Sequence, residues 1–65
     1  MNLGEIIQVE NNWYQVYRSI KEPKQLPNDM VVELRQLYGC THAFRANDKL
    51  FLCKEVPAVE FEKIV

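Results

Sequence analysis

The chain has too few glycines and cysteines for several common kinds of site. Its two glycines, Gly4 and Gly39, lie far apart, so no glycine-rich loop of the kind that cradles phosphate groups is present. Its two cysteines, Cys40 and Cys53, are too few for the disulfide framework of a small secreted domain. We therefore expect both cysteines to be free thiols in a reducing compartment.

The sequence also lacks a strong charge of one sign and a long apolar run. Eight basic residues against nine acidic residues leave a formal net charge of −1, which provides no overall field to attract phosphate backbones. No apolar run approaches the roughly 18 residues of a membrane span, and the residues after Met1 do not form a signal peptide. These features predict a cytoplasmic protein that has no membrane segment and no general affinity for nucleic acid.

The length of the chain limits the core that it can build. We expect residues 1–65 to form a single small domain. Folding of a chain this short removes only about 60% of the surface that the unfolded chain exposes, so its stability is marginal. A disulfide, a metal or a partner subunit would add stability, and each must be weighed against the residues present.

Residues 5–20 predict a β-hairpin that turns at Asn11-Asn12. Asparagine tolerates the positive φ of a two-residue type I′ turn, and β-branched and aromatic residues lie on both sides of the pair. This turn would place Ile7 opposite Val16. The strand alternation then separates a core face, with Ile7, Val9, Tyr14, Val16 and Ile20, from a second face, with Ile6, Gln8, Trp13, Gln15, Tyr17 and Ser19.

Residues 21–27 predict a loop, and a helix is predicted to follow it. The loop contains two prolines and three charged residues, which do not suit a central strand. Pro27, Asn28 and Asp29 are typical of a helix start, and Gly39 is predicted to end the helix at its C′ position. The predicted core-facing stripe of the helix comprises Met30, Val31, Leu34, Leu37 and Tyr38.

Residues 40–56 predict a second hairpin that turns at Asn47-Asp48. The predicted cross-strand pairs are His42 with Cys53, Ala43 with Leu52, and Phe44 with Phe51. After Pro57, the alternation of Val59 and Phe61 favours a short edge strand. The expected fold class is therefore α+β, in the order β-β-α-β-β with a possible short terminal strand. Its two hairpins form a small antiparallel sheet, and its one helix packs on one face.

Cys40, His42 and Cys53 form the sharpest candidate cluster for chemistry. The hairpin register brings these soft metal ligands towards one another, but the nearest fourth ligand is Glu55, in a place that structural zinc sites usually give to Cys or His. A catalytic pair of His42 and Cys53 would need an orienting residue and an oxyanion hole, and a hairpin face offers neither. We therefore expect no metal, no cofactor and no enzymatic activity.

The second face of the first hairpin is the candidate binding surface. The helix is expected to cover one side of the sheet, which leaves the aromatic residues of the other side to be covered by something else. The C-terminal segment, a second copy of the chain and a different protein are the three possible covers. We expect a protein-binding module, which would act as an accessory subunit, an adaptor or an inhibitor and would form a homodimer. The predicted partner-binding residues are Ile6, Trp13, Gln15 and Tyr17.

Single-stranded nucleic acid is the alternative ligand for the same surface. Bases would stack on Trp13 and Tyr17. The side chains available to contact phosphates are Arg18, Lys21, Lys24, Arg45, Lys49 and Lys54. Acidic residues on or beside the first hairpin, among them Glu22, dilute this positive potential, and no RNA-binding signature is present.

Overall fold

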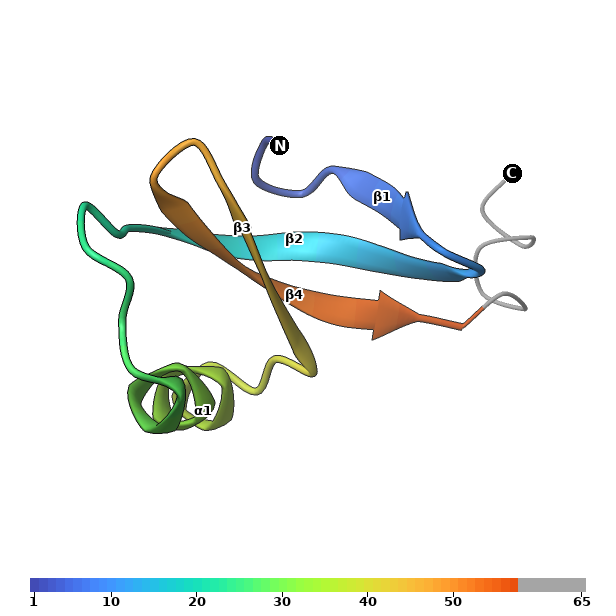
Figure 1. The fold of residues 1–65 in the computed structure, drawn as a ribbon. Coiled ribbons are helices and arrows are strands. Elements are labelled where there is room, and N and C mark those ends of the chain that lie inside the picture. The colour runs from blue at the N-terminus through green and yellow to red at the C-terminus, as the bar shows by residue number, and fades with distance from the viewer. Residues whose placement is uncertain (58–65) are drawn as a thin grey trace.

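The computed structural model describes residues 1–57, which form a four-stranded antiparallel sheet and one helix (Figure 1). The elements in chain order are β1 (Ile6–Val9), β2 (Asn12–Lys21), α1 (Asn28–Leu37), β3 (His42–Ala46) and β4 (Lys49–Val56). Strands β2 and β4 lie in the centre, because the spatial order is β1-β2-β4-β3. The predicted α+β fold is confirmed. The short strand predicted after Pro57 falls outside the described residues.

The second hairpin has the predicted turn and register. Asn47 and Asp48 have φ values of 53° and 58°, as a type I′ turn requires at both central positions. Strand β3 pairs with β4 so that His42 is opposite Cys53 and Phe44 is opposite Phe51. Asparagine and aspartate adopt positive φ more easily than other non-glycine residues, so this turn forms without glycine.

The first hairpin turns one residue earlier than predicted. Its turn residues are Glu10, which has a φ of 57°, and Asn11, so Val9 is opposite Asn12 and Ile7 is opposite Tyr14. The predicted pairing of Ile7 with Val16 is wrong. In the observed register the main chain of Val16 is free to bond with the N-terminal segment, and it accepts a hydrogen bond from the Gly4 amide at 2.8 Å. The shift moves each partner by two positions, so it leaves the face of every side chain unchanged.

A β-bulge at Tyr17 divides β2 into two halves of opposite alternation. Val16 is opposite Cys53 and Arg18 is opposite Leu52, so Tyr17 is an extra residue with no partner position on β4. Beyond it, the even-numbered positions of β2 face the other side of the sheet. Ile20 therefore does not share a face with Tyr14 and Val16, and its predicted position is wrong. The predicted position of Ser19 is wrong for the same reason, because Ser19 is opposite Phe51 and does not share a face with Trp13 and Gln15.

Each face of the sheet carries its own hydrophobic cluster. The cluster on the Tyr14 face contains Tyr14, Val16, Phe51 and Cys53, with Ile7, Val9, Phe44 and Ala46 packed against it. The cluster on the Leu52 face contains Cys40, Leu50 and Leu52, with Ile20, Leu26, Val31, Leu34, Tyr38 and Ala43 packed against it. The run Leu50 to Cys53 is buried on both faces of the sheet. An uninterrupted apolar sequence is typical of a strand in such a position.

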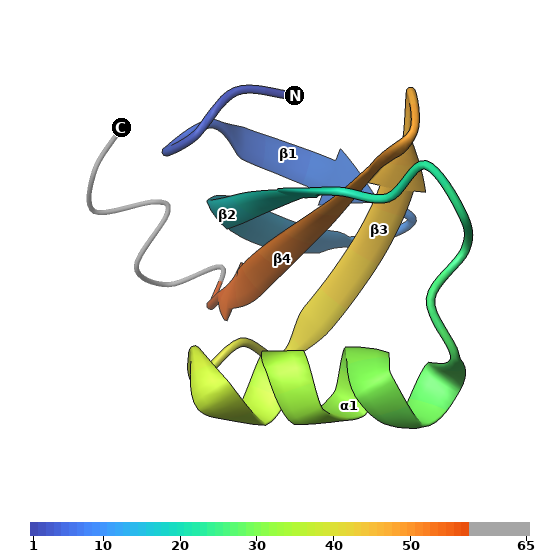
Figure 2. The same ribbon diagram turned by 90° about the vertical axis from the view of Figure 1, so that its left-hand side faces the viewer.

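Helix α1 covers the Leu52 face, which is the opposite of the face predicted. It lies beside β3 and β4 and away from β1 (Figure 2). Leu50 and Leu52 would be exposed without this cover, whereas the Tyr14 face is filled by aromatic contacts between strands, such as Tyr14 with Phe44 at 5.2 Å between ring centroids. The helix therefore packs where the sheet itself leaves apolar side chains uncovered.

The ends of α1 follow the sequence, but its apolar stripe is narrower than predicted. Pro27 takes the N-cap position, and Gly39 has a φ of 64° and donates its amide to the Gln36 carbonyl, as a Schellman ending requires. Val31, Leu34 and Tyr38 pack on the sheet, whereas Met30 is exposed and Leu37 is 71% exposed. No helix in the described part of the chain is long and apolar enough to cross a membrane.

The two leucine environments predict different costs of truncation. Leu52→Ala leaves a cavity in a side-chain site with no solvent exposure, so it should lower the free energy of unfolding by about 2–5 kcal/mol or unfold the chain. Leu37→Ala removes an exposed side chain and should change the free energy of unfolding by less than about 0.5 kcal/mol. Urea unfolding followed by circular dichroism measures both, and equal costs would contradict this assignment of the core.

Candidate functional site

The predicted partner-binding residues lie together on the Leu52 face, beyond the part that α1 covers. Ile6 is opposite Gln15, and Gln15 is opposite Lys54, so these three residues form one row across β1, β2 and β4. The neighbouring row places Trp13 opposite Val56. We call Ile6, Trp13, Gln15 and Tyr17, with Lys54 and Val56, the outer patch.

Alternation along β4 explains where the outer patch begins. Leu50, Leu52, Lys54 and Val56 are at every second position, so their side chains leave the same face of the strand. Leu50 and Leu52 belong to the cluster under the helix. Lys54 is exposed and Val56 is partly buried, so the face changes from core to surface between Leu52 and Lys54.

The members of the outer patch differ in how much of their surface is accessible. Tyr17 is 48% exposed, Gln15 is exposed, and Ile6 and Trp13 are partly buried. The Lys54 ammonium lies 4.1 Å from the centroid of the Tyr17 ring, which is a cation–π contact. The Gln15 side-chain amide donates to the Gly4 carbonyl at 3.2 Å, so Gln15 also anchors the N-terminal segment.

An N-terminal turn adds an exposed leucine next to the outer patch, which the sequence interpretation missed. The Glu5 amide donates to the Asn2 carbonyl at 3.1 Å, and Gly4 has a φ of 81°, as the third position of a type II turn requires. Leu3 occupies the second position and is 66% exposed. The hydrogen bond from Gly4 to Val16 holds this turn beside Tyr17. The signal that could have located it is the isolated glycine before the first strand.

Cys40, His42 and Cys53 are close along the second hairpin but do not converge. Cys40 belongs to the cluster on the Leu52 face, whereas Cys53 belongs to the cluster on the Tyr14 face. The His42 ring packs on Tyr14, with 4.6 Å between ring centroids, and its Nδ1 lies 3.0 Å from the Thr41 hydroxyl. Within residues 1–57, no group of three or more His, Cys, Asp or Glu residues has an arrangement that could hold a metal ion.

Both thiols are buried and held in their protonated form. Burial, with a smaller contribution from the neighbouring Cys40, raises the pKa of Cys53 to about 11. Burial also raises the pKa of Cys40. Each sulfur lies 3.7 Å from a main-chain carbonyl oxygen, that of Tyr38 for Cys40 and that of Phe51 for Cys53. At neutral pH neither cysteine is a thiolate, which is the form that acts as a nucleophile or metal ligand.

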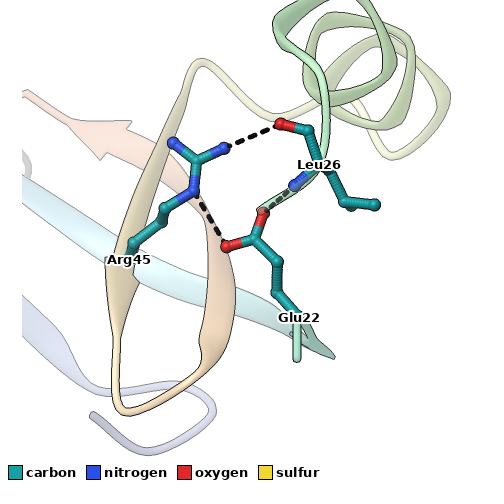
Figure 3. A network of polar contacts seen from close by, with 3 residues as sticks. All are labelled: Glu22, Leu26 and Arg45. Atoms are coloured by element: carbon teal, nitrogen blue, oxygen red, sulfur yellow. Dashed lines mark hydrogen bonds and ion pairs between the residues drawn. The ribbon is translucent and has the colours of Figure 1, made fainter. Parts of the chain in front are cut away.

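The connector between β2 and α1 is held by a buried carboxylate that the sequence interpretation treated only as a diluting charge. The Glu22 side chain is 4% exposed, and its Oε1 accepts a hydrogen bond from Arg45 Nε at 2.8 Å (Figure 3). Its Oε2 accepts one from the Leu26 amide at 3.1 Å. Arg45 Nη2 in turn donates to the Leu26 carbonyl at 3.3 Å. These three residues tie the connector to the edge strand β3.

Two adjacent pockets lie where this connector meets the turn between β3 and β4. The first, of about 350 Å³, is lined by Glu22, Arg45 and the turn residues. The second, of about 320 Å³, is lined by Lys21, Pro23, Lys49 and the same turn residues. The first pocket contains the Glu22–Arg45 ion pair, and Asp48 and Lys49 line it as well.

Comparisons of the chain with protein-family models, with curated proteins and with solved structures found no match. The functional assignment therefore depends on the geometry of the outer patch and of the pockets.

The Glu22 contacts predict a loss of stability in acid. The hydrogen bond from Arg45 lowers the pKa of Glu22 below its usual value of 4.5 and is the largest effect. Burial opposes this shift, and the hydrogen bond from the Leu26 amide and the charge of Arg45 add to the lowering. A carboxylate whose pKa is lower in the folded state stabilises the fold above its unfolded pKa, and that contribution is lost as the pH falls through the folded pKa. The melting temperature of the wild type should therefore decrease as the pH is lowered below about 4.5.

Glu22→Gln should lower the melting temperature at neutral pH and weaken its dependence on acid. Glu33→Gln is the matched control, because it removes the same charge from an exposed helical position. Thermal unfolding across the acidic range measures both variants. Equal pH profiles for the wild type and Glu22→Gln would contradict the role of this ion pair.

The buried thiols predict slow alkylation in the folded state. At about pH 8, iodoacetamide should modify Cys40 and Cys53 in guanidinium chloride but leave both unmodified in the native protein, because few thiolates form and access is blocked. Mass spectrometry of the quenched samples counts the modified thiols. Native alkylation as fast as that of the unfolded chain would show that either thiol is accessible.

Proposed function

We propose that this chain is a non-enzymatic protein-binding module that self-associates through the outer patch. The observation that supports this proposal best is Tyr17, a bulged aromatic residue that keeps about half of its surface exposed beside other apolar side chains. β-Bulges recur where a sheet re-aims a side chain towards a functional surface. Aromatic residues with few charges around them are the usual composition of protein interfaces.

The position of the patch favours a partner that lies flat on the sheet. Ile6, Trp13 and Val56 belong to three adjacent strands, so they form a broad surface instead of a closed pocket. Leu3 is a further exposed apolar residue, in the turn whose Gly4 amide bonds to the Val16 carbonyl. A protein surface with a complementary apolar centre suits this shape better than a small molecule, which needs a concave site.

A second copy of the chain is the simplest such partner. A two-fold dimer would place the outer patch of one protomer on that of the other, as isologous interfaces require. Withdrawal of about 100 Å² of apolar surface on each protomer would contribute about 5 kcal/mol before the cost of association is subtracted. A binding site for a different protein on the same patch would make the chain an accessory subunit, an adaptor or an inhibitor.

Single-stranded nucleic acid has less support as the ligand of this patch. Stacking requires an open aromatic face, and the Lys54 ammonium already occupies one face of the Tyr17 ring. The Arg18 guanidinium is likewise engaged, because it lies 4.2 Å from the centroid of the Tyr38 ring. Two of the cations that would contact phosphates are therefore used within the chain.

Dimer formation should depend on Tyr17. In sedimentation equilibrium at about 100 μM, the wild type should be a dimer, and Tyr17→Ala should weaken the dimer about tenfold or more because it removes apolar contact from both protomers. Trp13→Ala should act in the same direction. Both variants should keep the circular dichroism spectrum of the wild type, since neither residue belongs to the two buried clusters.

Leu37→Ala is the matched control for the dimer. It removes an exposed apolar side chain of similar size from α1, outside the outer patch, and should leave the dimer intact. A wild-type monomer at about 100 μM would contradict self-association. A monomer whose Trp13 fluorescence is that of a buried indole would show that the chain itself covers the outer patch. Binding of single-stranded DNA that is lost in Tyr17→Ala would support nucleic acid as the ligand of the patch.

A further inference from the structure

Two lysines lie side by side at the end of the sheet that is farthest from the turn of the first hairpin. Lys21 is the last residue of β2 and Lys49 the first of β4, and they are directly opposite each other in the register. Directly opposed residues on antiparallel strands share a face and have neighbouring side chains. Like charges at such positions destabilise a sheet, so this pair is costly in the unliganded protein.

Neither lysine forms an ion pair with a carboxylate within the described residues. The ion pair that residues 1–57 contain is the one between Arg45 and Glu22. Both oxygens of Glu22 are occupied, one by Arg45 and the other by the Leu26 amide. The Asp48 carboxylate lies beside the two lysines, so these three side chains leave a net charge of +1 at this end of the sheet in a chain whose formal net charge is −1.

The two lysines flank a preformed pocket. The pocket of about 320 Å³ lies between Lys21, Lys49, Pro23 and the Asn47-Asp48 turn. Its walls are held in place, because the Glu22 amide donates to the Asp48 carbonyl at 2.8 Å and links the connector to the turn. Pro23 has a restricted backbone, and the turn residues are fixed in the left-handed region. The main chain around the two lysines is thus held in place by contacts within the chain.

We propose that this pocket binds a phosphate group between the Lys21 and Lys49 ammonium groups. Each ammonium carries three donors and binds phosphate as a point charge, without the fixed planar geometry that an arginine would impose. A doubly charged anion removes the repulsion between the lysines and replaces it with two attractions. The Asp48 carboxylate also lines the pocket and opposes anion binding, so the two lysines must outweigh its repulsion.

Titration of the full-length protein with inorganic phosphate at low ionic strength tests the site. Amide and lysine side-chain NMR signals of Lys21, Lys49 and the Asn47-Asp48 turn should shift together and saturate. Lys21→Gln and Lys49→Gln should each weaken the fitted dissociation constant about tenfold. Lys54→Gln is the matched control, because it removes a lysine from the outer patch and should leave phosphate binding unchanged.

A second readout separates binding from general salt effects. Without phosphate, Lys49→Gln should raise the melting temperature, since it removes a like-charge pair. With phosphate, the wild type should gain more thermal stability than Lys49→Gln does, because a bound ligand stabilises the folded state. Equal gains in the two proteins, or shifts spread evenly over all lysines, would overturn the proposal.

Two probes identify the source of the phosphate group. Pyrophosphate represents a free small anion, and a single-stranded oligonucleotide represents a nucleic-acid backbone. If pyrophosphate binds more tightly than the oligonucleotide, and Lys21→Gln loses this binding, the natural ligand is a small phosphorylated molecule. If the oligonucleotide binds more tightly, and Lys21→Gln loses that binding, the natural ligand is a backbone phosphate of nucleic acid. Tyr17→Ala should affect neither probe, so failure of this site and failure of the proposed interface are distinguishable.

Discussion

The extra residue at Tyr17 is the constraint on which the two-cluster architecture depends. A regular β2 would direct Tyr14, Val16 and Ile20 to one face, because all three are even-numbered positions. The bulge instead sends Tyr14 and Val16 to one cluster and Ile20 to the other. One strand can therefore contribute to both faces of a sheet that is too small to leave either face bare. The same insertion leaves the Tyr17 ring outside both clusters, where it becomes the most exposed of the apolar and aromatic members of the outer patch.

Strand β4 and the contacts of Glu22 determine how the two faces of the sheet are covered. The run from Leu50 to Cys53 places apolar side chains on both faces, so cover is needed on each side. Phe44 and Tyr14 provide it on one side, and α1 provides it on the other. The helix can reach that position because Glu22 and Arg45 bring the connector to the edge of β3. The buried carboxylate of Glu22 accepts two hydrogen bonds and thus positions α1, a helix in which no residue is fully buried.

The two proposed functional surfaces lie at opposite ends of the sheet. The outer patch is built from the row through Ile6, Gln15 and Lys54, near the turn of the first hairpin. The lysine pair lies where β2 ends and β4 begins. Lys49 alternates with Phe51 and Cys53 along β4, so the lysine pair lies on the Tyr14 face, whereas the outer patch and α1 lie on the Leu52 face. A partner on the outer patch and an anion at the lysines would therefore not compete for the same residues.

The sequence by itself determined the elements, their order and the features that short-range chemistry decides. The Asn47-Asp48 turn, the register of the second hairpin and the Schellman ending at Gly39 all follow from residues that tolerate positive φ at the required positions. The sequence also places Trp13 and Gln15 on the opposite face from Tyr14 and Val16, because a register shift of two positions leaves each side chain on the same face of the strand.

Only the tertiary structure decided which face the helix covers, where Ile20 lies and what Glu22 does. A bulge has no strong sequence signal here, since Tyr17 looks like any other residue of an alternating strand. The bulge is defined only by the register of β2 against β4. The burial of Glu22 depends on Arg45, which is 23 residues away in the chain. The pairing of Lys21 with Lys49 likewise arises because β2 lies beside β4, and no local pattern in either segment specifies that neighbour.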